Sequence, residues 1–182
     1  MKRIYLIILA AISISTQIFS QTPNDFRGFS WGKSISEVQK AELSKFILKD
    51  KDDALEYADQ LAGSDCNVIY TFNENDKLIS GTYEFTRAYR NQQLNLQDYK
   101  RFRSLLITKY GQPKTDNSEQ TAENNLIDRD LNLNAAWETE RSMIKIDLVE
   151  HDNKLAMRIH YTTKSLNELD SEKQLKEALS KL

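Results

Sequence analysis

The side chains that most often carry catalysis or bind metals are sparse in this 182-residue sequence. It contains two histidines, His151 and His160, and one cysteine, Cys66. Metal sites need clustered imidazole, thiolate or carboxylate ligands. We expect His151 at a hairpin tip and His160 within a strand, too far apart to share a metal. No basic residue flanks Cys66, so we expect a buried strand residue and not a reactive thiol. No metal or cofactor site is therefore predicted.

The sequence also lacks the motifs of nucleotide-binding and calcium-binding sites. The sequence has no Walker-type phosphate loop, no G-x-G-x-x-G and no D-x-D-x-D-G loop. Acidic residues number 27, so pairs such as Glu138 with Glu140, or Glu56 with Glu84, do not by themselves indicate a glycosidase. We predict no catalytic residues and a protein that is not an enzyme. A weak hydrolase is kept as a third hypothesis.

The first 20 residues have the composition of a secretory signal peptide. Lys2 and Arg3 precede an apolar run that ends at Ile18, and Ser20 offers a small residue for cleavage. We expect a mature chain, residues 21–182, without a membrane span and free in a periplasm or outside the cell. An uncleaved N-terminal anchor is the alternative. Loss of the two basic residues takes the formal charge from −2 to about −4, and a mildly acidic, mixed surface argues against nucleic acid as a partner.

Two β-hairpins with similar sequences organise the mature chain. The first runs from Ile69 to Phe85 and the second from Ile146 to Tyr161, and an offset of 77 residues superimposes them. In both, the alternating apolar residues stay in phase across the turn, as a half-buried antiparallel sheet requires. The alternation predicts that Val68, Tyr70 and Phe72 pair with Tyr83, Gly81 and Ile79, and that Ile144, Ile146 and Leu148 pair with Tyr161, Ile159 and Met157.

Two helices are predicted from capping and periodicity. Ser34 and Glu37 form a capping box, which predicts a short helix that extends to about Leu43. An apolar stripe from Tyr99 to Tyr110 predicts the clearest helix of the chain, and Gly111 follows it where a helix C-terminus favours glycine.

Three further segments have alternative interpretations. The strap from Asp25 to Lys33 contains Phe26, Phe29 and Trp31, which we expect in the core, with an exposed aromatic patch as the alternative. Residues 112–130 are polar and acidic, as in a binding loop or a disordered segment. At the C-terminus, leucines at helical spacing predict a docked amphipathic helix, and a frayed end is the alternative.

Together these elements predict a single α+β domain over residues 21–182. Two helix-plus-antiparallel-strand repeats, at about 26–86 and 95–163, would join into one curved antiparallel sheet of about six strands. Helices would cover one face, the other face would meet solvent, and a C-terminal helix would span about 166–181.

The opening helix and the first hairpin resemble those of a known group. Trp31-Gly-Lys-Ser-Ile-Ser-Glu-Val38 is similar to the helix start of the β-lactamase-inhibitor-protein-like fold, which includes outer-membrane-assembly lipoproteins of the BamE (SmpA/OmlA) type. The hairpin with Lys77-Leu78 and Tyr83 is also similar. The resemblance implies a binding module. The chain lacks the lipid-anchor cysteine of the lipoproteins and the paired cysteines of the inhibitor, so no inhibitory residue carries over.

The leading functional hypothesis is a secreted or periplasmic binding module for an unknown envelope or extracellular protein. The exposed sheet face would make the contact, and an ordinary solvated face is the alternative. The candidate contacts are strand residues opposite the predicted core, with two aromatic anchors: Glu56, Thr71, Thr82, Glu84, Tyr89, Trp137, Lys145, Arg158 and His160.

A second hypothesis is a small-molecule or glycan binder with a cavity between sheet and helices. It is motivated by four strand tyrosines, which the alternation also allows as core residues: Tyr57, Tyr70, Tyr83 and Tyr161. The sequence identifies neither the partner nor the oligomeric state.

Overall fold

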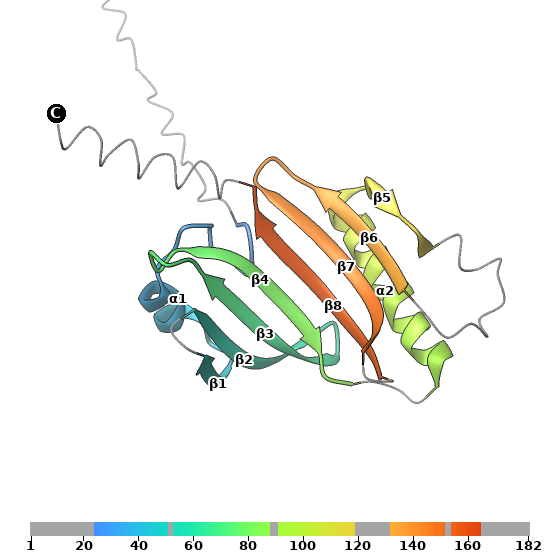
Figure 1. The fold of residues 1–182 in the computed structure, drawn as a ribbon, viewed down its shortest axis with the longest axis horizontal. Coiled ribbons are helices and arrows are strands. Elements are labelled where there is room, and N and C mark those ends of the chain that lie inside the picture. The colour runs from blue at the N-terminus through green and yellow to red at the C-terminus, as the bar shows by residue number, and fades with distance from the viewer. Residues whose placement is uncertain (1–23, 51–52, 88–90, 119–131, 152–153, 165–182) are drawn as a thin grey trace, which may run out of the picture.

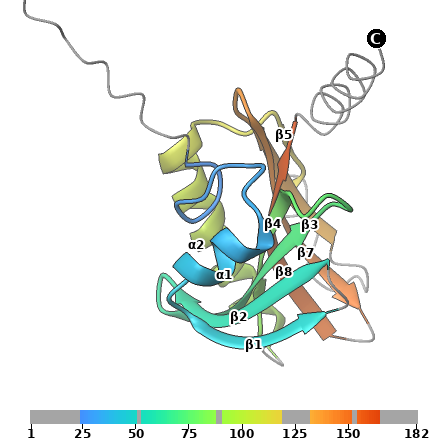
Figure 2. The same ribbon diagram turned by 90° about the vertical axis from the view of Figure 1, so that its left-hand side faces the viewer.

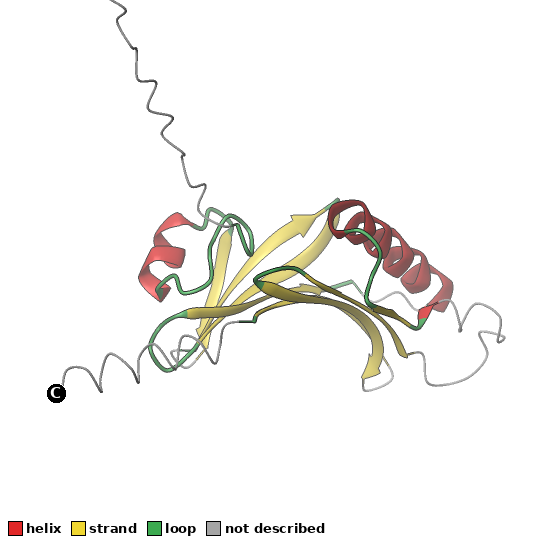
Figure 3. Cartoon of the chain, turned by 90° about the horizontal axis from the view of Figure 1, so that it is seen from above, coloured by secondary structure: helices red, strands yellow, loops and turns green. Residues whose placement is uncertain are grey.

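The computed structural model describes residues 24–50, 53–87, 91–118, 132–151 and 154–164. Within them, eight strands form one antiparallel sheet in the order β1-β2-β3-β4-β8-β7-β6-β5 (Figure 1). Both helices lie on one side of the sheet, the core face, and no described helix covers the other side, the open face (Figure 3). The elements are α1 (Ile35–Ala41), β1 (Lys45–Asp50), β2 (Ala54–Leu61), β3 (Ser64–Phe72), β4 (Leu78–Phe85), α2 (Gln92–Tyr110), β5 (Thr115–Asp116), β6 (Asn132–Glu138), β7 (Ser142–His151) and β8 (Lys154–Thr163).

The predicted fold, two helix-plus-strand repeats in a sheet of about six strands, is wrong. The described residues form a single eight-stranded sheet with two helices. The count of about six strands did not include the edge strands β1 and β5, although residues 46–48 were open between a strand and a buried turn. The register of β1 against β2 shifts between Phe46 and Leu48, which breaks the alternation of its side chains. β5 has only two residues, Thr115 and Asp116, too few to show a period of two.

The predicted hairpin pairings are confirmed except at one position. Tyr70 pairs with Gly81 and Val68 with Tyr83, and the β7–β8 register also matches the prediction. Ile79 is the exception, because the register shifts and Phe72 pairs with Leu78 instead. Leu78 is consequently the buried residue.

Both predicted helices form. The Ser34–Glu37 capping box is present in α1, and both of its hydrogen bonds are made. α2 begins earlier than the apolar stripe indicates, because the Asn91 side chain accepts a hydrogen bond from the Gln93 amide and caps the helix there. It ends at Gly111, which has a φ of 81° and whose amide donates to the Ile107 carbonyl.

The strap packs its aromatic rings into the core, so the alternative of an exposed aromatic patch is wrong. Phe26 and Trp31 are buried, and Phe29 packs against the core. The Trp31 indole Nε1 donates to Ser142 Oγ at 2.9 Å. The Asp25 carboxylate accepts from Arg141. The strap is thereby attached to the second half of the sheet as well as to the first.

The four strand tyrosines lie in the core and contact other aromatic rings. Tyr70 meets Tyr57 edge to face, with 5.8 Å between ring centroids, and Tyr83 meets Tyr161 at 6.3 Å. All four are buried. Phe26 touches three of them at centroid distances between 5.1 and 5.4 Å, so the rings fill the space between the strap and the sheet.

Several predictions fall outside the described residues. These are the signal peptide at 1–20, the C-terminal helix at about 166–181, residues 119–130 of the acidic stretch, and Tyr89. Among the described residues, no helix combines the length and apolar character needed to cross a membrane.

Gly81 is the point at which the strap meets the sheet, and it provides a test of this packing. A Cβ at Gly81 would lie 2.1 Å from Phe26 Cδ1, far inside van der Waals contact. We expect Gly81→Ala to lower the free energy of unfolding by about 1–3 kcal/mol, the usual cost of overpacking. Urea denaturation measures this loss.

The matched control is a double-mutant cycle with Phe26→Ala. Because the clash is with the Phe26 ring, Gly81→Ala should cost much less in the Phe26→Ala background. An equal cost in both backgrounds would contradict the proposed contact.

Candidate functional site

The sheet register brings polar residues from three strands together on the open face. Thr82 on β4 pairs with His160 on β8, which pairs with Lys145 on β7. Glu84 pairs with Arg158 in the next row. Directly opposite residues of antiparallel strands share a face, so the two rows lie side by side across the centre of the sheet.

Side-chain contacts link these rows. Thr82 Oγ1 and His160 Nδ1 are 2.7 Å apart. Arg158 Nε donates to Glu84 Oε1 at 2.8 Å. Lys145 Nζ lies 3.7 Å from an oxygen of Asp147, which pairs with Arg158 across β7 and β8. Acidic and basic groups therefore alternate on this part of the open face.

These residues line a hollow of about 440 Å³, which we call the charged hollow. Its two cations are its most exposed groups, with side-chain exposures of 53% for Lys145 and 45% for Arg158. The anions are less exposed, at 34% for Glu84 and 14% for Asp147. A molecule that approaches the hollow therefore meets positive charge first. The lining consists of Ile69, Thr82, Glu84, Lys145, Asp147, Arg158 and His160.

His160 is the titratable group at the centre of the charged hollow. Burial lowers its pKa below the ordinary 6.5, because a charged imidazolium loses hydration there. Lys145 and Arg158 lower the pKa further, whereas the Asp147 carboxylate raises it. The ring is consequently neutral at pH 7, and the two basic side chains supply the positive charge of the hollow.

Five of the nine predicted contact residues are thus brought together: Thr82, Glu84, Lys145, Arg158 and His160. Glu56 and Thr71 also lie on the open face, where they pair with Ile69 and Ser80, but they do not line the hollow. Trp137 was predicted wrongly as an exposed anchor. It is 3% exposed, and its Nε1 donates to the Gly111 carbonyl, so it belongs to the core.

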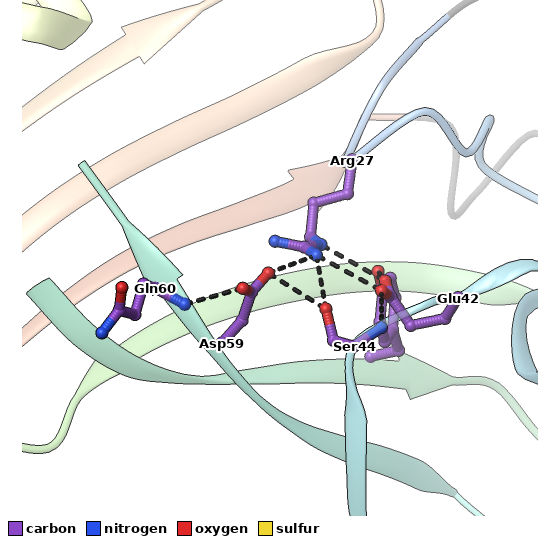
Figure 4. A network of polar contacts seen from close by, with 6 residues as sticks. Arg27, Glu42, Ser44, Asp59 and Gln60 are labelled. Atoms are coloured by element: carbon purple, nitrogen blue, oxygen red, sulfur yellow. Dashed lines mark hydrogen bonds and ion pairs between the residues drawn. The ribbon is translucent and has the colours of Figure 1, made fainter. Parts of the chain in front are cut away.

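A second polar cluster, whose residues form no motif in the sequence, surrounds Arg27 (Figure 4). Its guanidinium contacts Asp59 Oδ2 at 2.6 Å, Ser44 Oγ at 2.9 Å and both Glu42 oxygens at 3.3 Å. The Tyr70 hydroxyl also donates to Glu42. A hollow of about 530 Å³ opens beside this cluster.

The Arg27 cluster holds the strap in place, so we interpret it as a structural contact and not as the candidate functional site. Arg27 has a φ of 50° and precedes Gly28 in the tight turn between Phe26 and Phe29. The guanidinium is well supplied with acceptors, so it joins this turn to the end of α1 and to β2. The only sequence indication was an Arg-Gly pair between two phenylalanines, which is typical of a tight turn.

Residues Gly28 to Gly32 match the letters of the G-x-S-x-G nucleophile motif, with Ser30 at the serine position. That motif acts at a sharp turn from a strand into a helix, close to a histidine. Here the segment lies in the strap, and α1 begins only at Ile35. His160 lies on the opposite face of the sheet. The segment therefore does not have the structural context that this motif requires.

Comparisons with known proteins leave the family open. No protein family model matches this chain, and no curated protein matches it. A DUF4309 family protein from Bacillus subtilis is similar in structure, with a TM-score of 0.40 and 13% identity over 79% of this chain and 88% of that chain. At this TM-score neither fold nor function is transferred. The resemblance to the β-lactamase-inhibitor-protein-like group stays a prediction.

The electrostatics of the charged hollow can be tested by the titration of His160. We expect a pKa below 6.5, because burial and two neighbouring cations disfavour the imidazolium. Asp147→Asn should lower it further, since it removes the carboxylate that opposes these effects. Histidine NMR titration measures both values. Asp98→Asn on α2 is the matched control and should leave the pKa unchanged, and a rise in the Asp147→Asn variant would contradict the geometry.

The Arg27 cluster predicts a pH dependence of stability. Burial acts to raise the pKa of Glu42, but hydrogen bonds from Tyr70, the Ser44 amide and Arg27 outweigh it and hold the pKa at about 2. The folded-state value lies below the ordinary 4.5, so ionised Glu42 stabilises the fold fully above pH 4.5. This contribution is lost as the pH falls from 4.5 toward 2.

Glu42→Gln should therefore lower the free energy of unfolding by roughly 1–3 kcal/mol at pH 7 and flatten its pH dependence between pH 4.5 and 2. Urea denaturation over this pH range measures both effects. Glu74→Gln removes a carboxylate from an exposed position and should change neither. An unchanged pH profile in Glu42→Gln would refute the role of the cluster.

Proposed function

We propose that this protein is a secreted or periplasmic binding module, without enzymatic activity, that docks an acidic surface of a partner polypeptide onto the open face of its sheet. The charged hollow is the centre of this contact. The supporting observation is that five of the predicted contact residues line one hollow across β4, β8 and β7.

The acidic character of the partner is inferred from the exposure of the charges. Lys145 and Arg158 extend further into solvent than Glu84 and Asp147 do. A carboxylate on the partner can approach Lys145 and Arg158 while Lys145 stays close to Asp147 and Arg158 stays bound to Glu84. Such rim charges contribute mainly to the association rate and to specificity, and their effect weakens with salt.

A polypeptide partner agrees better with the lining than a small molecule does. Small-molecule pockets are mostly apolar and aromatic. Among the residues that the structure describes, the lining of the charged hollow has one aliphatic residue, Ile69, and no phenylalanine, tyrosine or tryptophan. The second hypothesis, a ligand cavity between sheet and helices, is less supported, because the four strand tyrosines pack ring against ring there.

The proposal can be tested by capture with charge-reversed variants. The purified protein is immobilised and exposed to envelope and extracellular fractions, and each retained protein is then measured against Lys145→Glu/Arg158→Glu. The partner should bind the wild type at low salt, and the double variant should weaken its affinity at least tenfold, which corresponds to about 1.4 kcal/mol. Raised salt should weaken binding as well.

Lys40→Glu/Lys100→Glu is the matched control, since it makes the same charge change at two exposed helix positions, one on α1 and one on α2. It should retain the partner, and thermal unfolding should show that all variants stay folded. The proposal fails if every captured protein binds Lys145→Glu/Arg158→Glu as well as it binds the control.

A further inference from the structure

A further hollow lies on the core face, at the end of the sheet where β6 turns into β7. The strap, which lies on the same side of the sheet as both helices (Figure 2), lines this hollow with Asn24 and Asp25. Tyr110 at the end of α2 and Ile144 of β7 supply the apolar part of the lining, and residues 139–142 supply the rest. We call this space of about 260 Å³ the turn hollow. None of its described lining residues belongs to the charged hollow.

Hydrogen bonds hold the polar groups around the turn hollow in place. The Asp25 carboxylate is 5% exposed and accepts from Arg141 Nε and Nη2, each at 2.9 Å. In the turn, the Ser142 amide donates to Thr139 Oγ1 at 2.9 Å, and the Thr139 amide donates to the Ser142 carbonyl at 2.9 Å. A ligand would therefore meet side chains whose positions are already set, which lowers the entropic cost of binding.

Two of the lining residues keep N–H groups that no described residue accepts. The Asn24 side-chain oxygen accepts from the Gly28 amide at 2.7 Å, and this leaves the Asn24 NH₂ group as a donor. Arg141 uses Nε and Nη2 for Asp25, so its Nη1 is also left as a donor. The Arg141 side chain is 43% exposed, so a ligand can reach it.

A buried hydroxyl and an exposed carboxylate complete the set. Ser142 is 3% exposed, and its Oγ accepts from the Trp31 indole at 2.9 Å, while the hydroxyl hydrogen has no acceptor among the described residues. Glu140 is exposed, and its carboxylate accepts no hydrogen bond from any residue that the structure describes. The hydrogen bond to Asp25 raises the pKa of Arg141 most, and the charge of Glu140 raises it further, so Glu140 lies close to the guanidinium. The turn hollow thus offers three donors and one anionic acceptor.

We propose that the turn hollow binds one ring of a carbohydrate, a neutral ligand with several hydroxyl groups. A hydroxyl donates one hydrogen bond and accepts others, so neighbouring hydroxyls of a sugar can satisfy both the three donors and the Glu140 carboxylate. The C–H groups of the ring would pack against Tyr110 and Ile144. A few fixed polar groups beside an apolar surface are typical of small-ligand sites.

The charges of the lining favour a neutral ligand over an ionic one. The Arg141 charge is balanced by the buried Asp25 carboxylate, whereas Glu140 has no ion-pair partner within the described part of the chain. Glu140 would repel an anion, and a simple cation would leave the three donors without acceptors. The volume is below the roughly 300–1,000 Å³ of sites for drug-sized ligands, so a single ring is the size that fits.

This proposal does not depend on the proposed function, because the two hollows lie on opposite faces of the sheet. It also differs from a ligand cavity among the strand tyrosines, since those rings pack against each other and fill that space. Lys145→Glu/Arg158→Glu, which should weaken the capture of a partner, should leave the affinity for a sugar unchanged. The two proposals can therefore fail separately.

NMR titration of the purified protein with free monosaccharides tests the proposal. The probes are glucose, galactose, mannose and N-acetylglucosamine, with alanine as a zwitterionic comparison. We expect at least one sugar to bind saturably with a Kd of roughly 1–10 mM, the range for a ligand of about 12 non-hydrogen atoms. Binding should shift the Trp31 indole signal, because Ser142 connects that indole to the hollow.

Glu140→Ala removes the anionic acceptor and should weaken the affinity for that sugar about tenfold. Glu74→Ala is the matched control, because it removes a carboxylate from an exposed position outside the lining. Thermal unfolding should show that both variants stay folded. The proposal is overturned if no sugar of the panel shifts the Trp31 signal saturably, if Glu140→Ala binds as tightly as Glu74→Ala, or if alanine binds in place of the sugars.

Discussion

The pairing of β4 with β8 is the interaction on which the rest of the structure depends. Five residue pairs, from Ser80–Thr162 to Glu84–Arg158, join strands that lie about 80 residues apart in the sequence. This pairing turns two four-stranded groups into one sheet. On the core face, the Phe26 ring packs against Gly81 at this pairing. On the open face, the paired residues form the centre of the charged hollow.

The strap reinforces this junction from the core side. Phe26 lies against Tyr83 of β4 and Tyr161 of β8, so a single ring covers the seam between the two groups of strands. Arg27 attaches the strap to α1 and β2, whereas Asp25 attaches it to Arg141 before β7. An N-terminal segment of few residues thereby joins what would otherwise be two smaller cores.

The sequence predicted most of what local pattern determines. Alternation with a period of two placed Tyr70 opposite Gly81 and Ile159 opposite Ile146, because a slip of one residue would expose every apolar side chain. The same alternation placed Trp137 on the same face of its strand as Leu133, which predicts a buried indole. The assignment of Trp137 as an exposed anchor was inconsistent with this alternation. Residues Gly28 to Gly32 are a contrasting example. They match the G-x-S-x-G motif, but they do not lie at the strand-to-helix turn that this motif requires.

The remaining features depend on pairings that no local pattern encodes. The bulge between Phe46 and Leu48 removed the alternation of β1, so that segment stayed open between a strand and a buried turn, and β5 was too short to alternate at all. The predicted count of about six strands is therefore too low. No turn connects β4 to β8, and their register therefore follows from the packing of the whole core. For this reason the sequence could predict that these residues lie on one exposed sheet face, but not that five of them line one hollow.

The most direct test of the β4–β8 junction is a solution NMR measurement of backbone nuclear Overhauser effects between the two strands. We predict contacts between Tyr83 and Ile159 and between Gly81 and Tyr161, together with slow amide exchange at the centre of both strands. Absence of these contacts, with β4 and β8 amides that exchange as fast as those of an open edge, would contradict a single sheet and remove the basis of the charged hollow.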